Sequence, residues 1–364
     1  MLIDIATASP PYKIFQSKAT EELKKRMATR PAVARLIDSA SNHSGISSRY
    51  VVLPDANDSN EKKFFTSGEN YINPDTKTRM EEYEKWSKRL TKEAAEKLFA
   101  NTGFDAQKID RLITVSCTGF FAPGLDYHLI NEFKIPLTVK RTNIGFMGCA
   151  ASIIGFNSVM EAMNSTKESS MNTLLVSVEL CSLHLQTEPT RDNILANMIF
   201  ADGAAAVLFS NSEAMKPKAK LKLLSTKSIL FENSSEFMGW KIGSFGFEMI
   251  LSSELPKIIL EQSVPALKNL IKDFGIKKEE IKHWALHPGG RAILDSLQNG
   301  LCLSDDEMAP SRNVLKNYGN MSSASILFVL KEIIQSGSLK KDDLCCAVAF
   351  GPGLTMEVAI LKGA

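Results

Sequence analysis

The sequence has 364 residues, of which 44% are hydrophobic and 23% charged, and these proportions exclude the disordered, fibrous and membrane-spanning classes of protein. With 43 basic and 41 acidic residues the net charge is +2, which provides no overall field for nucleic acid or for an anionic membrane. The length exceeds the usual size of one hydrophobic core, so we expect two domains or two fused halves.

The first residues, MLIDIATASPPYKIF, lack the features of a signal peptide, because Asp4 and two prolines interrupt a short apolar stretch that has no basic leader. We therefore expect a cytoplasmic protein whose six cysteines stay reduced. The cysteines form no CxxC pair and no Cys/His set with metal-ligand spacing. Neither a metal nor a disulfide is expected.

In the first half, apolar and β-branched runs alternate with segments of helical periodicity, which predicts strands alternating with helices. Strands are expected in 140–145 and 172–180, and a strand leading into a turn in 109–119. Helices are expected in 81–101 and 149–165, and a loop followed by a helix in 120–133. Segment 200–210 closes this half, and the stretch 211–225 then changes to alternating lysines. We place the internal boundary there, which divides the chain into residues 1–215 and 216–364.

The second half repeats the alternation of strand and helix. Its helices are expected in 252–275, 291–301 and 323–337, and its strands in 282–290 and in a pair within 343–363. Strand–helix alternation in two similar halves predicts an α/β fold with mostly parallel sheets between layers of helices. One helix of each half begins with small residues, at 148–151 and at 320–324, and is apolar nearly all round, as a helix packed between two sheets would be.

Cys149 is the first candidate for a catalytic group. At a helix N-terminus, free backbone N–H groups and the helix dipole favour an anion, so the thiol is expected to ionise easily and act as a nucleophile. The alternative is a buried cysteine that packs as a small hydrophobe, which is the commoner fate of a lone cysteine.

His287 leaves the apolar strand residues Trp284-Ala285-Leu286 directly into Pro288-Gly289-Gly290. This turn exposes the imidazole at a strand end, where α/β sheets place their sites, although a local hydrogen bond at the turn explains the residue as well. His283 and His287 have the HxxxH spacing of a helical metal pair, but on a strand the two rings do not share a helix face. A metal site is therefore rejected.

Three further segments have a structural and a functional interpretation. Asn320 precedes the second small-residue helix, so its side chain either caps that helix or points its NH₂ group at a reacting carbonyl. The Gly351-Pro352-Gly353 segment is a tight connection between strands or a backbone wall close to a ligand. Phe200, before Ala201-Asp202-Gly203, is either a core residue or part of a site.

Together, Cys149 in GFMGCAAS, His287 in HPGGRAILD, Asn320 in YGNMSSAS and the terminal FGPGLTMEVAIL closely resemble the type III polyketide synthases, the chalcone synthase-like enzymes. SCTGFFAPGLDYHLI and FADGAAAVLF match as well, in the same order along nearly the whole chain. The resemblance implies a thiolase fold, a duplicated five-layer αβαβα sandwich, working as a homodimer. It also implies an acyltransferase without a bound cofactor, whose substrates are CoA thioesters.

By that resemblance, Cys149 takes the acyl group of an acyl-CoA starter. His287 forms an ion pair with the thiolate and then, with Asn320, holds the thioester oxygen of malonyl-CoA while CO₂ leaves. Because decarboxylation generates the carbon nucleophile directly, two hydrogen-bond donors aimed at the enolate suffice and no strong base is needed. Repeated extension and cyclisation of the poly-β-keto chain would give a pyrone or a resorcinol-type ring.

The resemblance also implies a substrate cavity and a CoA tunnel. Phe200 matches the gatekeeping phenylalanine between the two, and Met249 replaces a second aromatic residue found there in plant enzymes. Cys117 and His184 fall where plant chalcone synthases carry cavity-lining threonines, and Gly351, Pro352 and Gly353 would form a cavity wall. For CoA itself, the expected contacts are Gly289, Ala292 and Arg35, with Ser39 and His43 near the places aligned to the basic residues of plant members.

Two other functions fit parts of the pattern. A β-ketoacyl-acyl carrier protein synthase of the ketoacyl synthase III kind shares the fold and a Cys/His/Asn triad, but HPGG and GNMSSAS fit the polyketide family better. A catalytically silent partner subunit is the second alternative. The complete set of Cys149, His287 and Asn320 argues against it.

Overall fold

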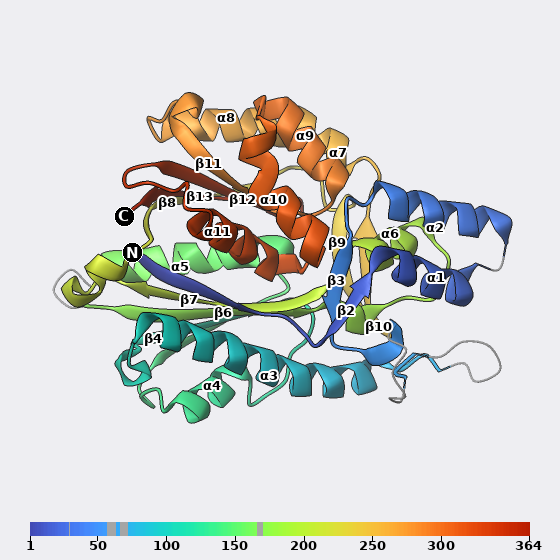
Figure 1. Ribbon diagram of the computed structural model, residues 1–364, viewed down its shortest axis with the longest axis horizontal. Coiled ribbons are helices and arrows are strands. Elements are labelled where there is room, and N and C mark those ends of the chain that lie inside the picture. The colour runs from blue at the N-terminus through green and yellow to red at the C-terminus, as the bar shows by residue number, and fades with distance from the viewer. Residues whose placement is uncertain (29, 57–62, 66–71, 166–169) are drawn as a thin grey trace.

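The structure is a computed structural model that describes residues 1–28, 30–56, 63–65, 72–165 and 170–364. Helices and strands are stacked in five layers, with two outer helical layers, two layers of sheet and a pair of helices between them (Figure 1). This is the αβαβα sandwich expected from the sequence.

Nine strands of the described residues form one continuous sheet that folds over to supply both sheet layers, and four others pair in two small sheets. Its order is β11 (Ile281–Leu286), β12 (Leu344–Gly351), β13 (Thr355–Gly363), β8 (Leu221–Leu230), β1 (Leu2–Ala8), β7 (Asp202–Ser210), β6 (Asn172–Leu180), β4 (Arg111–Ser116) and β5 (Lys140–Gly145). Strands β8 and β1 join the two layers through a single pairing, Leu2 with Leu221.

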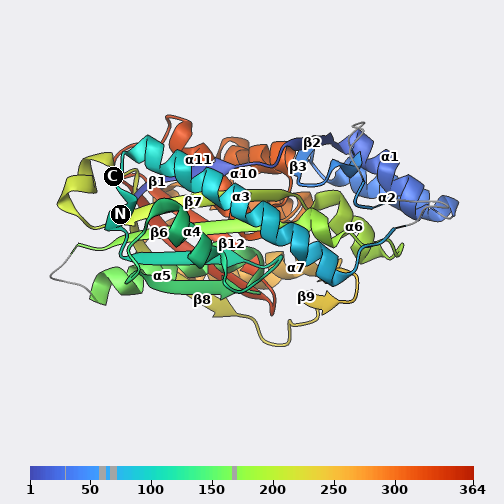
Figure 2. The ribbon, with the colours of Figure 1, turned by 90° about the horizontal axis from the view of Figure 1, so that it is seen from below.

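The helices fall into three layers. Between the sheet layers lie α5 (Ala151–Ser165) and α11 (Ser325–Gln335). One outer layer consists of α3 (Thr76–Thr102) and α4 (Leu125–Phe133). The other outer layer consists of α7 (Leu255–Ile258), α8 (Val264–Asp273) and α9 (Arg291–Leu301). Helix α10 (Asp305–Tyr318) packs on β11 and α11. Figure 2 shows α3 crossing the face of β1, β7 and β6 along most of its length.

The two halves have the same topology. The order β1-β7-β6-β4 in the first half corresponds to β8-β13-β12-β11 in the second, and β4–β6 and β11–β12 are the matching parallel pairs. The expectation of mostly parallel sheets is wrong, because β7 and β13 each run antiparallel to both neighbours. The predicted boundary after residue 215 falls inside the short 3₁₀ helix η6 (Glu213–Lys218) and stays a prediction.

Most predicted elements are present with shifted ends. The helix predicted over 81–101 is longer, because Asp75 caps its start by accepting a hydrogen bond of 2.8 Å from the Thr78 backbone N–H, and it ends where Gly103 takes φ +61°. The single helix predicted over 252–275 is instead α7, a π-helical turn from Ile259 to Ser263, and α8.

A second group of elements lies at the end of the molecule opposite the two termini (Figures 1 and 2). It comprises β2 (Tyr12–Phe15), α1 (Gln16–Met27), α2 (Pro31–His43), β3 (Ser48–Val51), α6 (Arg191–Ile199) and the hairpin β9 (Met238–Gly243) with β10 (Gly246–Leu251). The starts of α5 and α11 face this end, so these elements enclose the candidate site. Within the described residues, every helix is too short or too polar to cross a membrane.

Candidate active site

Cys149 lies in the 3₁₀ helix η4 (Gly148–Ala150), which leads directly into the central helix α5. Gly148 takes φ +64°, and a Cβ at this position would lie 2.2 Å from Cδ of Pro352. Only glycine fits there, and its close contact places the 351–353 segment over the cysteine. A Cβ at Gly351 would likewise lie 2.7 Å from the Met147 carbonyl oxygen. Cys149 is 7% exposed, so a reagent reaches its sulfur only through a cavity.

His287 follows β11, and its backbone N–H continues the parallel pairing by donating to the Val348 carbonyl at 2.8 Å. The side chain is 2% exposed. Among the residues that the structure describes, neither ring nitrogen has a hydrogen-bond partner. Because an unpartnered buried polar group costs free energy, this ring is a candidate for binding a ligand.

Asn320 follows α10, at the place where the two halves meet. The backbone N–H of Asn320 donates to the Ile199 carbonyl, and the Asn320 carbonyl accepts from the Ala201 N–H, both at 2.9 Å. These two hydrogen bonds pair Asn320 with Phe200 in an isolated parallel β-bridge. Its side-chain Oδ1 accepts from the Ser322 N–H at 2.8 Å. This hydrogen bond fixes the orientation of the amide just before η9 (Ser322–Ala324), whose N-cap residue is Met321, and a role of the NH₂ toward a reacting carbonyl stays a prediction.

The amide NH₂ of Asn320 has two hydrogens with different surroundings. Nδ2 donates to the Gly289 carbonyl at 3.2 Å, in the turn that follows His287. The same side chain also hydrogen-bonds the Cys149 thiol, as does that of Ser322. Asn320 thus connects the cysteine with the histidine turn.

The structure does not contain the expected Cys149–His287 ion pair. Burial raises the pKa of the Cys149 thiol to about 12, and hydrogen bonds from Ser322 and Asn320 offset only part of this shift. Burial also lowers the pKa of the His287 ring to about 3. The loss of solvation on burial outweighs the stabilisation that the helix N-terminus gives to a thiolate. The thiol of Cys149 and the ring of His287 are therefore both neutral before a substrate binds.

Glu179, at the end of β6, lies beneath the site and is fully buried. Its carboxylate accepts from the Cys117 N–H at 3.0 Å, from the Thr118 hydroxyl at 2.8 Å and from the Ser323 hydroxyl. Burial raises its pKa to about 7 despite these hydrogen bonds. Glu179 therefore ties the turn after β4 to the start of α11, on either side of Cys149.

A narrow cavity of about 30 Å³ lies against the side chain of Cys149. Its lining is mostly apolar and comes from both halves of the chain: Cys117, Thr118, Gly148, Cys149, Cys181, Phe200, Met238, Trp240, Met249, Ser322 and Pro352. Five residues predicted from the sequence, Cys117, Cys149, Phe200, Met249 and Pro352, thus line one cavity. The fold thus brings together residues that lie far apart in the sequence.

His184 does not line this cavity, which corrects the prediction. Its Nε2 lies 2.7 Å from the Thr118 carbonyl, its Nδ1 accepts from the Phe247 N–H at 2.9 Å, and its ring stacks on Phe247 at 4.2 Å between centroids. This pattern requires the neutral ring with the proton on Nε2, and burial lowers the pKa of the ring to about 3. His184 holds the cavity wall in place from behind.

The remaining predicted residues lie around the site rather than in the cavity. Gly353 packs on Leu230, and its carbonyl accepts from the Ser234 hydroxyl at 2.7 Å. Ala292 is exposed in the first turn of α9, and Arg35 is exposed on α2. Their contact with CoA, and that of Gly289, stays a prediction.

Six residues of the cavity lining were not predicted as site residues: Thr118, Gly148, Cys181, Met238, Trp240 and Ser322. Trp240 on β9 faces Met249 on β10 across the hairpin and donates from Nε1 to the Cys117 carbonyl at 2.8 Å. Ser322 takes φ +45° at the start of η9 (Ser322–Ala324), a strained conformation for a residue other than glycine. Its place two residues after Asn320 is a signal that could have identified it.

A fold of five layers, with a cysteine at the start of one central helix and an asparagine at the start of the other, defines a condensing enzyme of the thiolase fold. Comparison with family models agrees with this class. Residues 222–364 match the C-terminal domain of chalcone and stilbene synthases, and residues 57–231 match the FAE1/type III polyketide synthase-like protein family.

Individual relatives extend the match over the whole chain. The alpha-pyrone synthesis polyketide synthase-like Pks18 of Mycobacterium tuberculosis is 31% identical over 273 residues, which cover 74% of this chain and 68% of the relative. A putative chalcone synthase of Bacillus subtilis is 29% identical over 368 residues, covering 99% and 98%.

Solved structures agree with these relatives. PKS-I from the brown alga Ectocarpus siliculosus superposes with a TM-score of 0.91 at 28% identity, over 100% of this chain and 98% of the other. The 1,3,6,8-tetrahydroxynaphthalene synthase of Streptomyces coelicolor gives 0.86 at 27% identity, over 100% and 99%. The chain belongs to the type III polyketide synthases, the chalcone synthase-like family of condensing acyltransferases.

Proposed function

We propose that this enzyme loads a starter acyl group from CoA onto Cys149, extends it with malonyl-CoA by repeated decarboxylative condensation, and cyclises the chain to a pyrone or resorcinol-type product. The names of two relatives support this, since one is an alpha-pyrone synthesis enzyme and the other makes a polyhydroxylated naphthalene. No cofactor is needed, because the thioester supplies the activated carbonyl and decarboxylation supplies the carbanion.

In the loading step, Sγ of Cys149 attacks the thioester carbonyl of the starter and its proton passes to the ring of His287. Since both groups are neutral at rest, the transfer separates charge only while the new S–C bond forms. The C–S bond to CoA then breaks, and the imidazolium returns the proton to the departing CoA thiolate. The acyl enzyme is left with a neutral histidine.

In the extension step, His287 and Asn320 both donate hydrogen bonds to the thioester oxygen of malonyl-CoA. A ring with a pKa of about 3 keeps an N–H donor without becoming charged, and the amide does not titrate. As CO₂ leaves, its bonding electrons form the enolate whose oxygen these donors stabilise. The enolate carbon attacks the acyl carbonyl on Cys149, and the S–C bond breaks with its electron pair on Sγ, which takes up a proton from solvent. The lengthened chain is released on CoA for the next round.

The buried, unpartnered ring of His287 beside the fixed amide of Asn320 is the observation that carries this proposal. A substrate carbonyl that accepts from the ring supplies the missing partner. The mostly apolar side chains around Cys149 would keep water away from the reacting groups.

The test is to incubate the enzyme with malonyl-CoA and a panel of short, aromatic and long acyl-CoA esters, and to follow acyl-enzyme and products by mass spectrometry. Cys149→Ala should lose acylation and product, whereas Cys181→Ala, which changes another thiol of the same cavity, should keep both. Acylation and CO₂ release that persist in Cys149→Ala would disprove the nucleophile. A single condensation that requires malonyl carrier protein would favour the ketoacyl synthase III alternative.

We also propose that the enzyme is a homodimer. Phe120, Met147 and Phe245 are 58%, 42% and 49% exposed, and the rings of Phe120, Phe146 and Phe247 contact one another next to the loop that carries Cys149. An apolar surface of this kind favours association with another protein surface. Light scattering should give twice the mass of the chain, and Phe120→Ser should weaken the association; a monomer at micromolar concentration would contradict the proposal.

A cytoplasmic location is proposed as well. The six cysteines are free thiols in the structure, and five of them are buried. Cytosolic reducing conditions keep thiols in this state. Recovery of the enzyme with the soluble cytosolic fraction after gentle lysis would agree with this location, and recovery with exported proteins would contradict it.

A further inference from the structure

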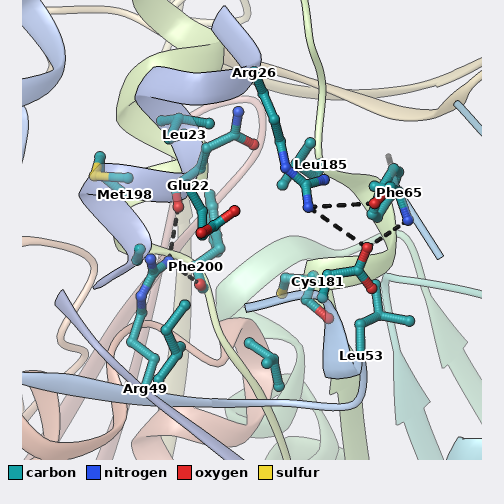
Figure 3. Close-up of a pocket in the computed structure, with 16 residues that line it drawn as sticks. Glu22, Leu23, Arg26, Arg49, Leu53, Phe65, Cys181, Leu185, Met198 and Phe200 are labelled. Carbon is teal, nitrogen blue, oxygen red and sulfur yellow. Dashed lines mark hydrogen bonds and ion pairs between the residues drawn. The ribbon is translucent and has the colours of Figure 1, made fainter. Parts of the chain in front are cut away.

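Arg49, on β3, is a buried positive charge that the chemistry described above does not use. It is 5% exposed, and Figure 3 shows its side chain reaching the backbone at Phe200. Its Nη1 donates to the Phe200 carbonyl at 2.7 Å and to the Asn197 carbonyl at 2.8 Å. Because the last carbonyls of a helix have no partner within the helix, these two hydrogen bonds make Arg49 a cap of the C-terminal end of α6.

The guanidinium group of Arg49 stays charged although it is buried. Burial lowers the pKa of Arg49 to about 10, and the nearby carboxylate of Asp202 opposes this shift. The negative end of the α6 dipole attracts the guanidinium as well. Because taking a charge out of water costs free energy, a buried arginine of this kind is suited to hold the groups around it in one arrangement.

The aliphatic stem of Arg49 lies against the second half of the chain. A Cβ at Gly319 would lie 2.8 Å from Cγ and 2.9 Å from Cδ of Arg49, so only glycine allows this contact. Gly319 takes φ +72° and ends α10 directly before Asn320. One side chain therefore contacts both segments that meet at the isolated β-bridge between Phe200 and Asn320.

The bridge depends on contacts of this kind for its register. It consists of two backbone hydrogen bonds outside the sheets, so no sheet aligns the two segments. The neighbours of Arg49 reinforce its contact with α10, because the Ser47 N–H and the Ser48 hydroxyl donate to carbonyls in the last turn of that helix at 2.7 and 3.2 Å. Residues 47–49 thus join the end of α6 in the first half to the end of α10 in the second.

Both residues of the bridge have side chains at the candidate active site. Phe200 lines the cavity at Cys149. The amide of Asn320 hydrogen-bonds the Cys149 thiol and the Gly289 carbonyl. A misplacement of about 1 Å in a positioned group can lower a rate about a hundredfold. The position of the bridge therefore determines whether the Asn320 amide meets a substrate oxygen.

We propose that Arg49 is a positioning residue for decarboxylation: by holding the Phe200 carbonyl and packing on Gly319, it fixes the Asn320 amide where this donates to the thioester oxygen of malonyl-CoA. The inference rests on the proposed function. In this role Arg49 contacts no substrate and acts only through Asn320. Loading of Cys149, in which the proton passes to His287, should depend on Arg49 only weakly.

The first test separates the two steps with Arg49→Lys. Lysine keeps the charge, but its ammonium group ends one bond short of the Nη1 position, so both hydrogen bonds lengthen. For CO₂ release from malonyl-CoA, kcat should fall at least tenfold while KM stays within threefold. Acylation of Cys149 by acetyl-CoA, followed by intact mass, should change less than threefold. An unchanged kcat for CO₂ release would overturn the proposal, and so would an equal loss of both steps, which would mark Arg49 as purely structural.

Arg26→Lys is the matched control. Arg26 lines the same pocket as Arg49 and has a side chain that is 8% exposed (Figure 3). Its partners are Asp55 and the Phe65 carbonyl rather than the residues of the bridge. Arg26→Lys should therefore change neither step. A tenfold loss of CO₂ release in Arg26→Lys would overturn the proposal, since the effect would then come from any change to a buried arginine in this region.

The second test asks whether Arg49 acts through Asn320. Asn320→Ala should lower CO₂ release from malonyl-CoA at least a hundredfold, because it removes a donor to the enolate oxygen. In the Asn320→Ala background, Arg49→Lys should lower the remaining rate less than twofold, because there is no amide left to position. A further tenfold loss in that background would show that the two residues act independently, and the proposal would be wrong.

These outcomes are distinct from a failure of the proposed function. If the unmodified enzyme releases no CO₂ from malonyl-CoA, or if Asn320→Ala releases it at the full rate, the proposed extension step itself is wrong. If Asn320→Ala loses CO₂ release and Arg49→Lys keeps it, only the inference about Arg49 is wrong.

Discussion

The pH dependence of Cys149 reactivity tests the most consequential electrostatic feature of the site, the neutral resting thiol. A shift of the thiol pKa from 9.0 to about 12 lowers the thiolate fraction at neutral pH by about three orders of magnitude. The thiolate that remains is more basic and hence more nucleophilic, by about 15- to 30-fold at a Brønsted coefficient of about 0.4–0.5. The net reaction with a small disulfide should therefore be about 30- to 60-fold slower than that of an ordinary protein thiol.

The assay is the rate of modification of Cys149 by a small alkyl disulfide, followed by intact mass from about pH 6 to about pH 10. Cys302 is the exposed cysteine, so the measurement uses Cys302→Ser, with Cys149→Ser in the same background as the blank. The rate should rise tenfold for each pH unit with no plateau. The same chain unfolded in urea should react faster at neutral pH by at least the factor given above.

His287→Ala separates the resting state from the reaction. Because the ring is neutral and does not hydrogen-bond the sulfur in the structure, its removal should leave disulfide reactivity nearly unchanged while acyl transfer from CoA esters falls at least a hundredfold. A plateau in rate below about pH 8 that disappears in His287→Ala would refute the reasoning, since it is the signature of a thiolate–imidazolium pair.

Three other changes have defined outcomes. Below about pH 6.5 His287 becomes protonated in the unfolded chain, whereas the buried ring of the native state, with a pKa of about 3, stays neutral. The free energy of unfolding therefore falls by about 1.4 kcal/mol for each pH unit. His287→Leu should lack this loss and, by urea titration, gain about 2 kcal/mol of stability relative to the unmodified protein between pH 7 and pH 5. Gly148→Ala should lose more than about 2 kcal/mol, because φ is +64° and the added Cβ would meet Pro352. Trp240→Phe should cost about 1 kcal/mol and alter the product ratio, because the Cys117 carbonyl loses its donor.

Each of these three predictions has a control. Above about pH 7 the free energy of unfolding of His287→Leu should depend on pH as that of the unmodified protein does. If the two proteins also have the same slope below pH 7, the ring of His287 is not buried in its neutral form. Gly275→Ala, at φ +72° with open space around the Cβ, isolates the backbone cost, and an equal loss at both glycines would exclude the contact with Pro352. An unaltered product ratio in Trp240→Phe would show that this ring does not shape the cavity.

The local sequence pattern predicted those elements of the fold in which every residue is buried. The run from 172 to 180 is buried at every position, and its β-branched composition predicted β6 with its observed ends. Cys149 and Asn320 stood out because small residues precede two helices that are apolar nearly all round, as helices of a central layer are.

The hairpin β9–β10 could not be predicted in this way. Its side chains are mostly half-buried, and its position depends on hydrogen bonds from distant residues, such as the Phe247 N–H that donates to His184 and the Trp240 indole that donates to Cys117. The cavity wall made by Trp240 and Met249 is thus a product of tertiary contacts. The sequence contains no local signal for it.

The ionisation state of Cys149 was also beyond local reasoning, and for a physical reason. The helix start favours a thiolate, and that feature is visible in the sequence. Burial opposes it more strongly, and burial depends on Pro352 and Phe200, which come from elsewhere in the chain. The competition between the two effects is decided only after folding.

The pairing of Asn320 with Ile199 and Ala201 has a consequence for how the enzyme is made. A chain still on the ribosome, with its last segment unsynthesised, possesses the nucleophile of the first half but not the amide that completes the site. Because the backbone bridge joins the two halves, the amide of Asn320 takes its place only when they pack against each other. Under the proposed mechanism, decarboxylative extension therefore requires that the two halves are docked.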